Sequence, residues 1–191
     1  ACYQRQSDNF FIPTDEKGNN IWVNSTCLIK DGVLFGSQNK FYFYSYQDSS
    51  LRLLQSLNQE SNFNITQLSL WNDHTLLCCS RWQGLLLLDL NTGKYSLPPF
   101  DCGKEIMNML IDSQNRIWIA PYNGGVSCFT HDGTRLASYT TQNSELNNDV
   151  VLSLAEREGK IWIGTDGGGI NILEPKTGKF TLLEHIPESD N

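Results

Sequence analysis

Apolar residues in this chain occur in short alternating runs rich in β-branched and aromatic side chains, a pattern typical of β-strands. One such run occurs four times, at intervals of 44, 41 and 43 residues counted back from the last copy: 161–165, 117–121, 76–80 and 33–37. The i, i+3, i+4, i+7 spacing of an amphipathic helix is missing from these repeats. A strand-rich repeat of this length matches one four-stranded blade, so the pattern predicts a β-propeller.

The other strands of each blade are expected at the same offsets. We name the strands A to D in chain order within a blade, and the four repeated runs are strands B. Strand A is expected at 22–29, 65–70, 106–111 and 150–154, strand C at 41–44, 85–90, 126–129 and 170–173, and strand D at 51–54, 95–97, 135–139 and 180–183. The glycine-containing stretches 91–94, 132–133 and 176–179 are typical hairpin turns between C and D.

Extending the alignment toward the N-terminus places residue 1 in the column of strand C, so we expect the chain to open on an outer half blade. The expected segments are 1–21 for the half blade and 22–60, 61–104, 105–146 and 147–191 for four complete blades. A four-bladed ring fits the count, but the half blade would be left over, and closed propellers avoid unpaired inner edges. We therefore predict one all-β propeller segment over 1–191, an open arc cut from a larger propeller of seven blades, which would need about 300 residues.

Composition excludes two classes of partner. Fourteen basic and twenty-one acidic residues give a net charge of −7, which provides no general field to attract nucleic acid. The longest nearly pure apolar run is 85–88, far shorter than the roughly 20 residues that span a bilayer. The first residue is Ala1 and no leader follows it, so we expect any signal peptide to be removed or to lie upstream.

The six cysteines show no spacing typical of a zinc site, so we predict no structural metal. Cys78 and Cys79 are neighbours in an expected strand, and their side chains must point to opposite faces, so at least one should pack in the core. Disulfides are possible, but the sequence does not pair them. The cysteines are Cys2, Cys27, Cys78, Cys79, Cys102 and Cys128.

The last repeat resembles the two-component regulator propeller repeat. The resemblance rests on Ile-Trp-Ile-Gly-Thr at 161–165, the glycine turn after it, Gly-Ile-Asn-Ile-Leu-Glu-Pro at 169–175 and Thr-Gly-Lys-Phe at 177–180. Residues 150–156 match the preceding strand and 115–119 form a second good copy, while the two earlier copies are degenerate. Repeats of this family build extracytoplasmic sensor regions of hybrid two-component systems, best known from gut Bacteroides.

The resemblance implies a role rather than a reaction. It implies a periplasmic region of an inner-membrane sensor, which detects a glycan breakdown product and signals to a cytoplasmic histidine kinase and a DNA-binding regulator of polysaccharide utilisation genes. None of those downstream parts is in this chain. The expected partner is an oligosaccharide or another small ligand, with contact to the membrane only through the parent protein and with no cofactor.

Residues that could catalyse a reaction are scattered along the chain. The three histidines lack a sequence neighbour that would make a nucleophile or a metal site, and we expect them on the surface. Three carboxylates fall in A–B turns, where Asp and Glu commonly face solvent. We predict no catalytic residue among them: His74, His131, His185, Asp112, Glu156 and Glu158.

Binding is easier to place, because the B–C turns and the D–A connections of a propeller lie on one face. The B–C turns are 38–39, 81–83, 122–123 and 166–167. An aromatic face beside amide, guanidinium and carboxylate groups suits a sugar ring, whose C–H surface stacks and whose hydroxyls need planar polar partners. The alternative is that the two aromatic residues fold back and pack on the blades. The candidate ligand-binding residues are Arg81, Trp82, Gln83, Tyr122, Asn123 and Asp166.

Tryptophans and glycines in the repeats are expected to be structural. Trp22, Trp118 and Trp162 belong to strand columns and should fill the wedge between blades. The glycines of 124–125 and 167–169 should allow positive φ in the B–C reversals. A phosphate site at 167–169 would need a following helix N-terminus, which the sequence does not predict.

Three functions are therefore compared. The first is a non-enzymatic ligand-sensing segment, which can dimerise through exposed blade edges. The second is a propeller-fold lyase or glycosidase, which would need clustered His, Tyr or carboxylate groups. The third is a protein-binding scaffold, which would show an exposed apolar patch.

Overall fold

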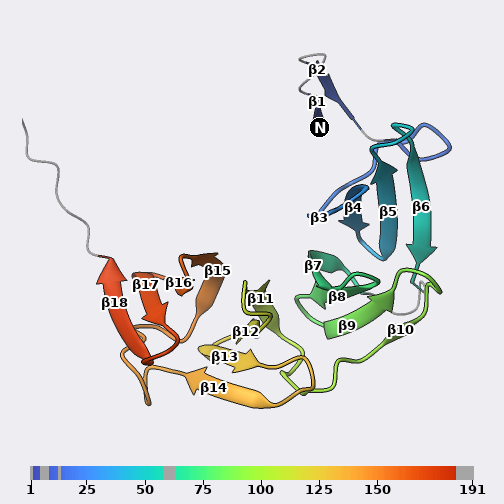
Figure 1. Cartoon of the computed structure of the whole chain (residues 1–191). Coiled ribbons are helices and arrows are strands. Elements are labelled where there is room, and N and C mark those ends of the chain that lie inside the picture. Colours follow the sequence, from blue (N-terminus) through green and yellow to red (C-terminus); the bar gives the residue numbers. More distant parts are fainter. Residues whose placement is uncertain (1, 5–8, 13, 58–62, 184–191) are drawn as a thin grey trace, which may run out of the picture. The chain divides into compact units, whose positions relative to one another are not determined.

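The structure is a computed structural model that describes all residues except 1, 5–8, 13, 58–62 and 184–191 (Figure 1). The described residues form strands and turns without helices, so none of them forms a helix that could cross a membrane. The chain divides into two compact units, Ala1–Leu97 and Pro98–Asn191, and each is described by itself.

The first unit contains a two-stranded sheet and two four-stranded antiparallel sheets. The small sheet pairs β1 (Cys2–Gln4) with β2 (Asn9–Phe11). The first blade has the strands β3 (Ser25–Ile29), β4 (Gly32–Ser37), β5 (Lys40–Ser45) and β6 (Leu51–Ser56). The second blade has the strands β7 (Ile65–Asn72), β8 (Thr75–Ser80), β9 (Gly84–Asp89) and β10 (Tyr95–Ser96).

The second unit contains two further four-stranded antiparallel sheets in simple chain order. The third blade has the strands β11 (Ile106–Ile111), β12 (Ile117–Pro121), β13 (Val126–Phe129) and β14 (Arg135–Tyr139). The fourth blade has the strands β15 (Val151–Arg157), β16 (Lys160–Thr165), β17 (Gly169–Glu174) and β18 (Lys179–Leu183). The predicted all-β fold of four-stranded antiparallel blades is confirmed, while the segment boundaries and the size of a larger propeller stay predictions.

Each unit buries a core between its two blades. In the first unit, Leu34 and Phe43 of β4 and β5 pack with Leu76 and Cys78 of β8. In the second unit, Trp118 of β12 packs with Ile161 and other residues of the fourth blade. Strands β8 and β12 are buried on both faces, which explains why their sequences read as continuous apolar runs rather than as strict alternation.

The predicted packing role of the tryptophans holds for Trp118, which is 1% exposed, whereas Trp162 is half-buried. It is wrong for Trp22, which is 80% exposed and precedes the first strand of its blade. The pairing of β3 with β4 explains why Trp22 is exposed. Strand β4 ends at Ser37, and the backbone N–H of Asn24 makes the last bond to it, with Gly36 C=O at 2.9 Å. Residues 21–23, which include Trp22, therefore have no residue of β4 to pair with.

The expectation that Asp112 faces solvent is also wrong, because this residue is only 5% exposed. Its Oδ1 accepts hydrogen bonds from the backbone N–H groups of Gln114 (3.0 Å) and Arg116 (2.8 Å). Its Oδ2 accepts from Arg116 Nε and Trp118 Nε1, both at 2.7 Å. Asp112 thus fixes the turn between β11 and β12 and is not available as a catalytic group.

The glycine turns behave as predicted at the reversals between strands B and C. Gly84, Gly125, Gly167 and Gly169 have φ between 66° and 82°. At Gly125 a Cβ atom would lie 2.1 Å from the carbonyl oxygen of Tyr139, so no side chain fits. The turn at 167–169 leads into a strand, β17, rather than into a helix, as expected for a hairpin.

Candidate functional site

The first set of candidate residues lies in the turn between β8 and β9. Arg81, Trp82 and Gln83 are all exposed, and Trp82 retains 60% of its surface. The guanidinium carbon of Arg81 lies 5.2 Å from the centre of the Trp82 ring, a cation–π arrangement that holds the two side chains together. Trp82 therefore is not packed in a core, and its role in binding stays a prediction.

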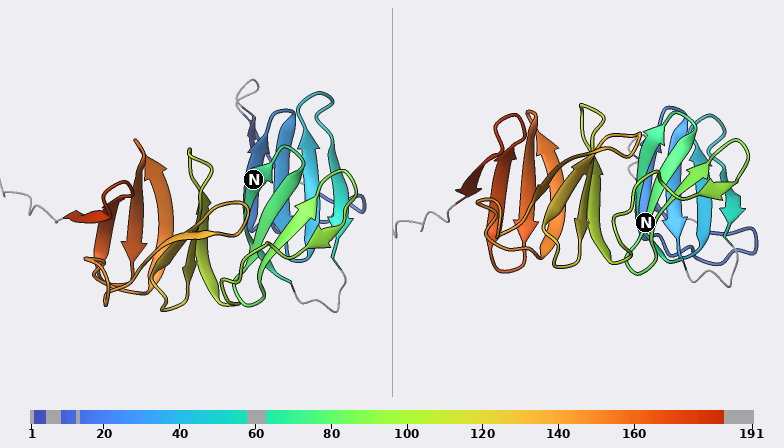
Figure 2. Two further views of the ribbon diagram at one scale, coloured as in Figure 1. Left: turned by 60° about the horizontal axis from the view of Figure 1, so that its bottom comes forward. Right: turned by 90° about the horizontal axis from the view of Figure 1, so that it is seen from below.

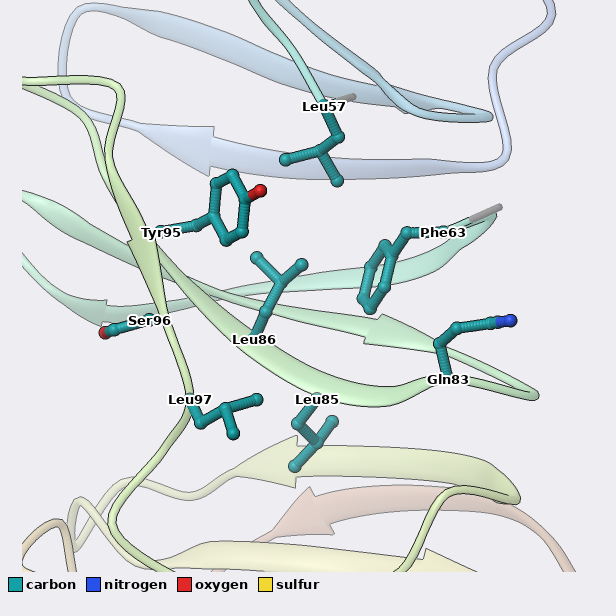
Figure 3. A pocket seen from close by; sticks show the side chains of 8 residues that line it. All are labelled: Leu57, Phe63, Gln83, Leu85, Leu86, Tyr95, Ser96 and Leu97. Atoms are coloured by element: carbon teal, nitrogen blue, oxygen red, sulfur yellow. The ribbon is translucent and has the colours of Figure 1, made fainter. Parts of the chain in front are cut away.

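A pocket of about 360 Å³ begins at Gln83 and runs along β9 (Figure 3). Figure 3 shows Leu57, Phe63, Leu86 and Tyr95 pointing toward one another. These residues come from both ends of the connection between β6 and β7 and from the strands β9 and β10. The full lining is Leu57, Phe63, Gln83, Leu85, Leu86, Tyr95, Ser96 and Leu97.

The shortness of β10 explains why this pocket exists. The Asp89 N–H donates to Lys94 C=O at 2.9 Å, so residues 89 and 94 form a hydrogen-bonded pair of β9 and the outer strand. In an antiparallel ladder every second pair is hydrogen-bonded, so the next such pair is 87 with 96, and the one after it would be 85 with 98. Residue 98 is a proline, which has no N–H to donate, and a second proline follows it. The outer strand therefore stops at Ser96, whereas β6, β14 and β18 are six, five and five residues long.

The interrupted strand leaves space beside Leu86. If β10 continued in register, Leu97 would stand opposite Leu86 and share its face of the sheet. Instead Leu97 lies on the other side of β9 with Leu85 and is 80% exposed (Figure 3). The pocket thus lies where the next residue of β10 would stand opposite Leu86. Its walls are apolar except for the neutral groups of Gln83, Tyr95 and Ser96.

The second set of candidate residues lies in two turns of the second unit. Tyr122 is 55% exposed, and its backbone N–H donates to Glu105 C=O at 2.7 Å. Asn123 adopts φ of 51° in the same turn, which the short polar side chain of Asn tolerates. Asp166 is exposed, and its N–H donates to Val150 C=O at 2.9 Å.

The sequence did not reveal the polar residues that hold these two turns. Gly125 N–H donates to Asp149 C=O at 2.9 Å, and Asn148 Nδ2 donates to Asp166 C=O at 2.6 Å. The stretch 147–149 thereby connects the turn of Tyr122 and Asn123 with the turn of Asp166. The signal was present as the polar run Asn-Asn-Asp directly before an apolar strand.

Asn147 attaches this stretch to the fourth blade. Its Oδ1 accepts hydrogen bonds from Asn171 Nδ2 at 2.8 Å and Thr165 Oγ1 at 3.2 Å, and its Nδ2 donates to Gly168 C=O. Asn171 is 1% exposed, so its amide needs these partners. The six candidate residues thus fall into two sets, three in each unit, and the structure links the members within each set.

The described titratable groups do not suggest covalent catalysis. Burial raises the pKa of Cys79 to about 11 and that of Cys128 to about 12, and it raises the pKa of Cys78 as well. These thiols are therefore protonated at neutral pH and are poor nucleophiles. Cys27, Cys78, Cys79 and Cys128 are free thiols. Both Cys78 and Cys79 are fully buried, which confirms the expected core role.

The described histidines and carboxylates do not suggest a catalytic site either. His74 is exposed as expected, whereas His131 is half-buried, and burial lowers the pKa of its imidazole, so the expectation of a surface position is wrong there. His185 lies outside the described residues. Glu156 accepts hydrogen bonds from the N–H and hydroxyl of Ser113 and thus connects the third and fourth blades. Within the described part of the chain, no group of three or more His, Cys, Asp or Glu side chains could hold a metal ion.

Comparison with known proteins supports the resemblance of the last repeat. Residues 145–167 match the family model described as two component regulator propeller. The match covers the 147–149 stretch, strands β15 and β16 and the start of the glycine turn. No curated protein matches the chain.

Several solved structures share the fold. An extracellular domain of a hybrid two-component system from B. thetaiotaomicron aligns over 87% of this chain and 25% of its own, with 14% identity and a TM-score of 0.66. A second such domain from that organism aligns over 91% of this chain and 27% of its own, with 15% identity and a TM-score of 0.67. The computationally designed Ika4 protein aligns over 83% of this chain and 94% of its own, with 12% identity and a TM-score of 0.59.

The chain therefore spans about a quarter of the length of the two extracellular domains. At these identities the likeness shows the propeller fold. The regulator propeller match identifies the type of repeat in the fourth blade.

Proposed function

We propose that this chain is a ligand-sensing propeller segment in the periplasmic region of a hybrid two-component sensor. The observation that carries the proposal is the match of 145–167 to the two component regulator propeller model. The extracellular two-component domains that share the fold support it. The parent protein would be a histidine kinase and response regulator in the inner membrane, which controls genes for polysaccharide utilisation, and the segment itself would not be an enzyme.

The proposed ligand is a glycan breakdown product that binds at the B–C turns. In the first unit, the exposed ring of Trp82 offers a stacking face, and the adjacent pocket offers apolar walls with the neutral polar groups of Gln83 and Tyr95. A sugar ring has both kinds of surface, apolar C–H groups and hydroxyls. In the second unit, Tyr122, Asn123 and Asp166 supply the same kinds of group on turns that backbone hydrogen bonds hold in place.

Signalling requires that ligand binds one state of the sensor more tightly than another, because equal affinity shifts no equilibrium. The connection between β6 and β7 contributes Leu57 and Phe63 to the pocket. Leu57 is also bonded to the preceding B–C turn, since its N–H donates to Asn39 C=O at 2.7 Å. A ligand in the pocket would therefore affect the positions of both blades of the first unit.

The test is calorimetric titration of the whole chain with a panel of neutral oligosaccharides from digested polysaccharides. We expect Trp82→Ala to weaken binding at least about tenfold, the equivalent of 1.4 kcal/mol, through loss of the stacking surface. Its urea midpoint should not change, because the ring is 60% exposed. Tyr46→Ala is the matched control, since Tyr46 is 54% exposed at the opposite end of a blade and should bind like wild type.

Absence of binding across the panel, or equal affinity of the Trp82→Ala variant and wild type, would remove this site. A protein-binding scaffold is the second candidate function. The observation that favours it is the apolar character of the pocket and the exposed side chains of Tyr95 (54%) and Leu97 (80%). A propeller-fold lyase or glycosidase would instead shorten the oligosaccharides, which chromatography of the incubated panel would show.

A further inference from the structure

The pocket beside Leu86 lies within the first unit, where its two blades meet, and both views of Figure 2 show these blades side by side. Leu57, Phe63 and Leu86 form its apolar wall and are 3%, 6% and 6% exposed. None of the described residues that line it carries a charge. A carboxylate, sulfate or ammonium group would therefore find no partner in the pocket, which suits an uncharged group.

A plain sugar ring fits this apolar wall poorly. Each hydroxyl of a hexose needs a hydrogen-bonding partner, and the side chains of Leu and Phe offer none. The ring is better placed at the B–C turn, against the exposed face of Trp82, which directly precedes Gln83 of the pocket. The volume of about 360 Å³ beside Leu86 is then left for a substituent of the ring that ends in an apolar group.

The edge of β9 adds a hydrogen-bonding position to the pocket. Leu85 also lines the pocket, and the strand register would pair it with residue 98. Because Pro98 has no N–H, the C=O of Leu85 is left without its ladder donor. The open position is one residue long, since β9 begins at Gly84 and the preceding position that faces outward is Gln83, in the turn. It can therefore take a single amide N–H, but not a peptide strand, which bonds along several residues.

Gln83 supplies a donor at the mouth of the pocket. Figure 3 shows its side chain beside Phe63. Its Oε1 accepts a hydrogen bond from the Ser80 hydroxyl at 3.4 Å, so Nε2 is the part of the amide that can donate to a ligand. The pocket thus offers an acceptor at Leu85 and a donor at Gln83, together with an apolar wall.

We propose, on the basis of the glycan-sensing function above, that this pocket binds the N-acetyl group of an amino sugar. An acetamido group is uncharged, ends in a methyl group and carries one N–H and one C=O. Its methyl group would contact Phe63 and Leu86. Its N–H would donate to Leu85 C=O, and its C=O would accept from Gln83 Nε2. The sugar ring itself would stack on Trp82 outside the pocket.

The test is calorimetric titration of the whole chain with three β-1,4-linked disaccharides that differ only in the group at C2. N,N′-diacetylchitobiose carries acetamido groups, chitobiose carries free amines and cellobiose carries hydroxyls. We expect the acetylated disaccharide to bind at least about tenfold more tightly than either of the others. The reason is that an ammonium group would have no partner of opposite charge in the pocket, and a hydroxyl group would face an apolar wall.

Two pocket variants test the location of the acetyl group. Leu86→Phe fills the pocket, and Gln83→Leu removes the proposed donor from an exposed residue, so each should reduce the preference for the acetylated disaccharide. Leu87→Phe is the matched control, because Leu87 is half-buried on the opposite face of β9 and its variant should keep the preference. Trp82→Ala should weaken the acetylated disaccharide and cellobiose by the same factor, since the ring stacks on the sugar. Circular dichroism of each variant checks that its strands are intact.

The outcomes separate this proposal from the function on which it rests. If cellobiose or other unacetylated oligosaccharides bind as tightly as N,N′-diacetylchitobiose, the glycan-sensing function stands and the acetyl pocket is refuted. If no oligosaccharide binds, both fail. Folded Leu86→Phe and Gln83→Leu variants that keep the full preference would also overturn the proposal. Tighter binding of N-acetyl-leucine methylamide than of the acetylated disaccharide would assign the pocket to a peptide instead.

Discussion

The Asp112 turn gives the sharpest test of how the third blade is stabilised. Asp112→Asn keeps the shape of the side chain but replaces one acceptor oxygen with an NH2 group. That group would face two donors, Arg116 Nε and Trp118 Nε1, which now bond Oδ2 at 2.7 Å. The Asp112 side chain is fully buried and that of Arg116 is 16% exposed, so water cannot replace the lost partners fully.

The magnitude follows from these two bonds. A hydrogen bond to a charged group contributes about 1.5–3 kcal/mol, and breaking a buried ion pair from one side costs about 3–5 kcal/mol. We therefore expect Asp112→Asn to lower the free energy of unfolding by about 3–5 kcal/mol. The assay is urea unfolding of the whole chain, followed by the fluorescence of its five tryptophans, to which Trp118 contributes.

Asp101→Asn is the matched control in the same unit. Asp101 is exposed, and its carboxylate accepts from the backbone N–H of Gly103 at 2.9 Å. Its substitution should cost at most about 1 kcal/mol, as expected for one exposed hydrogen bond. If Asp112→Asn cost no more than Asp101→Asn, the four bonds of Asp112 would not stabilise the blade and the reasoning would fail.

Three further predictions concern the turns and the thiols. Gly125→Ala should destabilise the chain more than Gly159→Ala in thermal unfolding: both residues have positive φ, but a Cβ meets Tyr139 C=O at Gly125 and open space at Gly159. Equal melting temperatures would contradict this. Alkylation near pH 8, followed by mass spectrometry, should modify Cys79 and Cys128 far more slowly in the folded chain than in the urea-unfolded chain, because burial raises their pKa to about 11 and about 12. Rapid labelling of folded Cys128 would count against it. The Thr130 hydroxyl and the Thr134 amide lower the pKa of Asp132, so its stabilising effect is present above the unfolded pKa of about 3.9 and is lost as pH falls through the lower folded value. Asp132→Asn should accordingly flatten the acid-induced loss of stability measured by urea unfolding below about pH 4, and an unchanged slope would refute the assignment.

The sequence predicted the strands well because the repeat period reflects burial, which recurs at each blade. β12 was predicted at 117–121 and β16 at 161–165, and the structure has Ile117–Pro121 and Lys160–Thr165. Three of the four B–C turns were likewise recognised through a glycine that signals positive φ, whereas in the turn at 38–39 the positive φ is at Gln38. Local pattern is sufficient for these features, because each depends on residues within a few positions of itself.

Features that depend on ladder register could not be predicted in the same way. Trp22 lies in the column of a strand residue but is exposed, because the end of β4 decides where pairing stops. Predicting the pocket beside Leu86 would have required the strand register, which places Pro98 opposite Leu85. Asp112 was recognised as a turn residue, but its bond to Trp118 Nε1 appears only once the two strands are paired.

The backbone hydrogen bonds of the turns have a consequence for protein engineering. The turns that carry Tyr122 and Asp166 are attached to the adjacent connections through main-chain N–H and C=O groups, at Glu105, Asp149 and Val150. The side chains of Tyr122, Asn123 and Asp166 are exposed and contribute little to that attachment. Randomising Tyr122 and Asp166, and varying Asn123 only among Asn, Asp and Gly because of its φ of 51°, should therefore leave the blades intact. The chain is thus suited to libraries in which recognition is varied on a fixed scaffold.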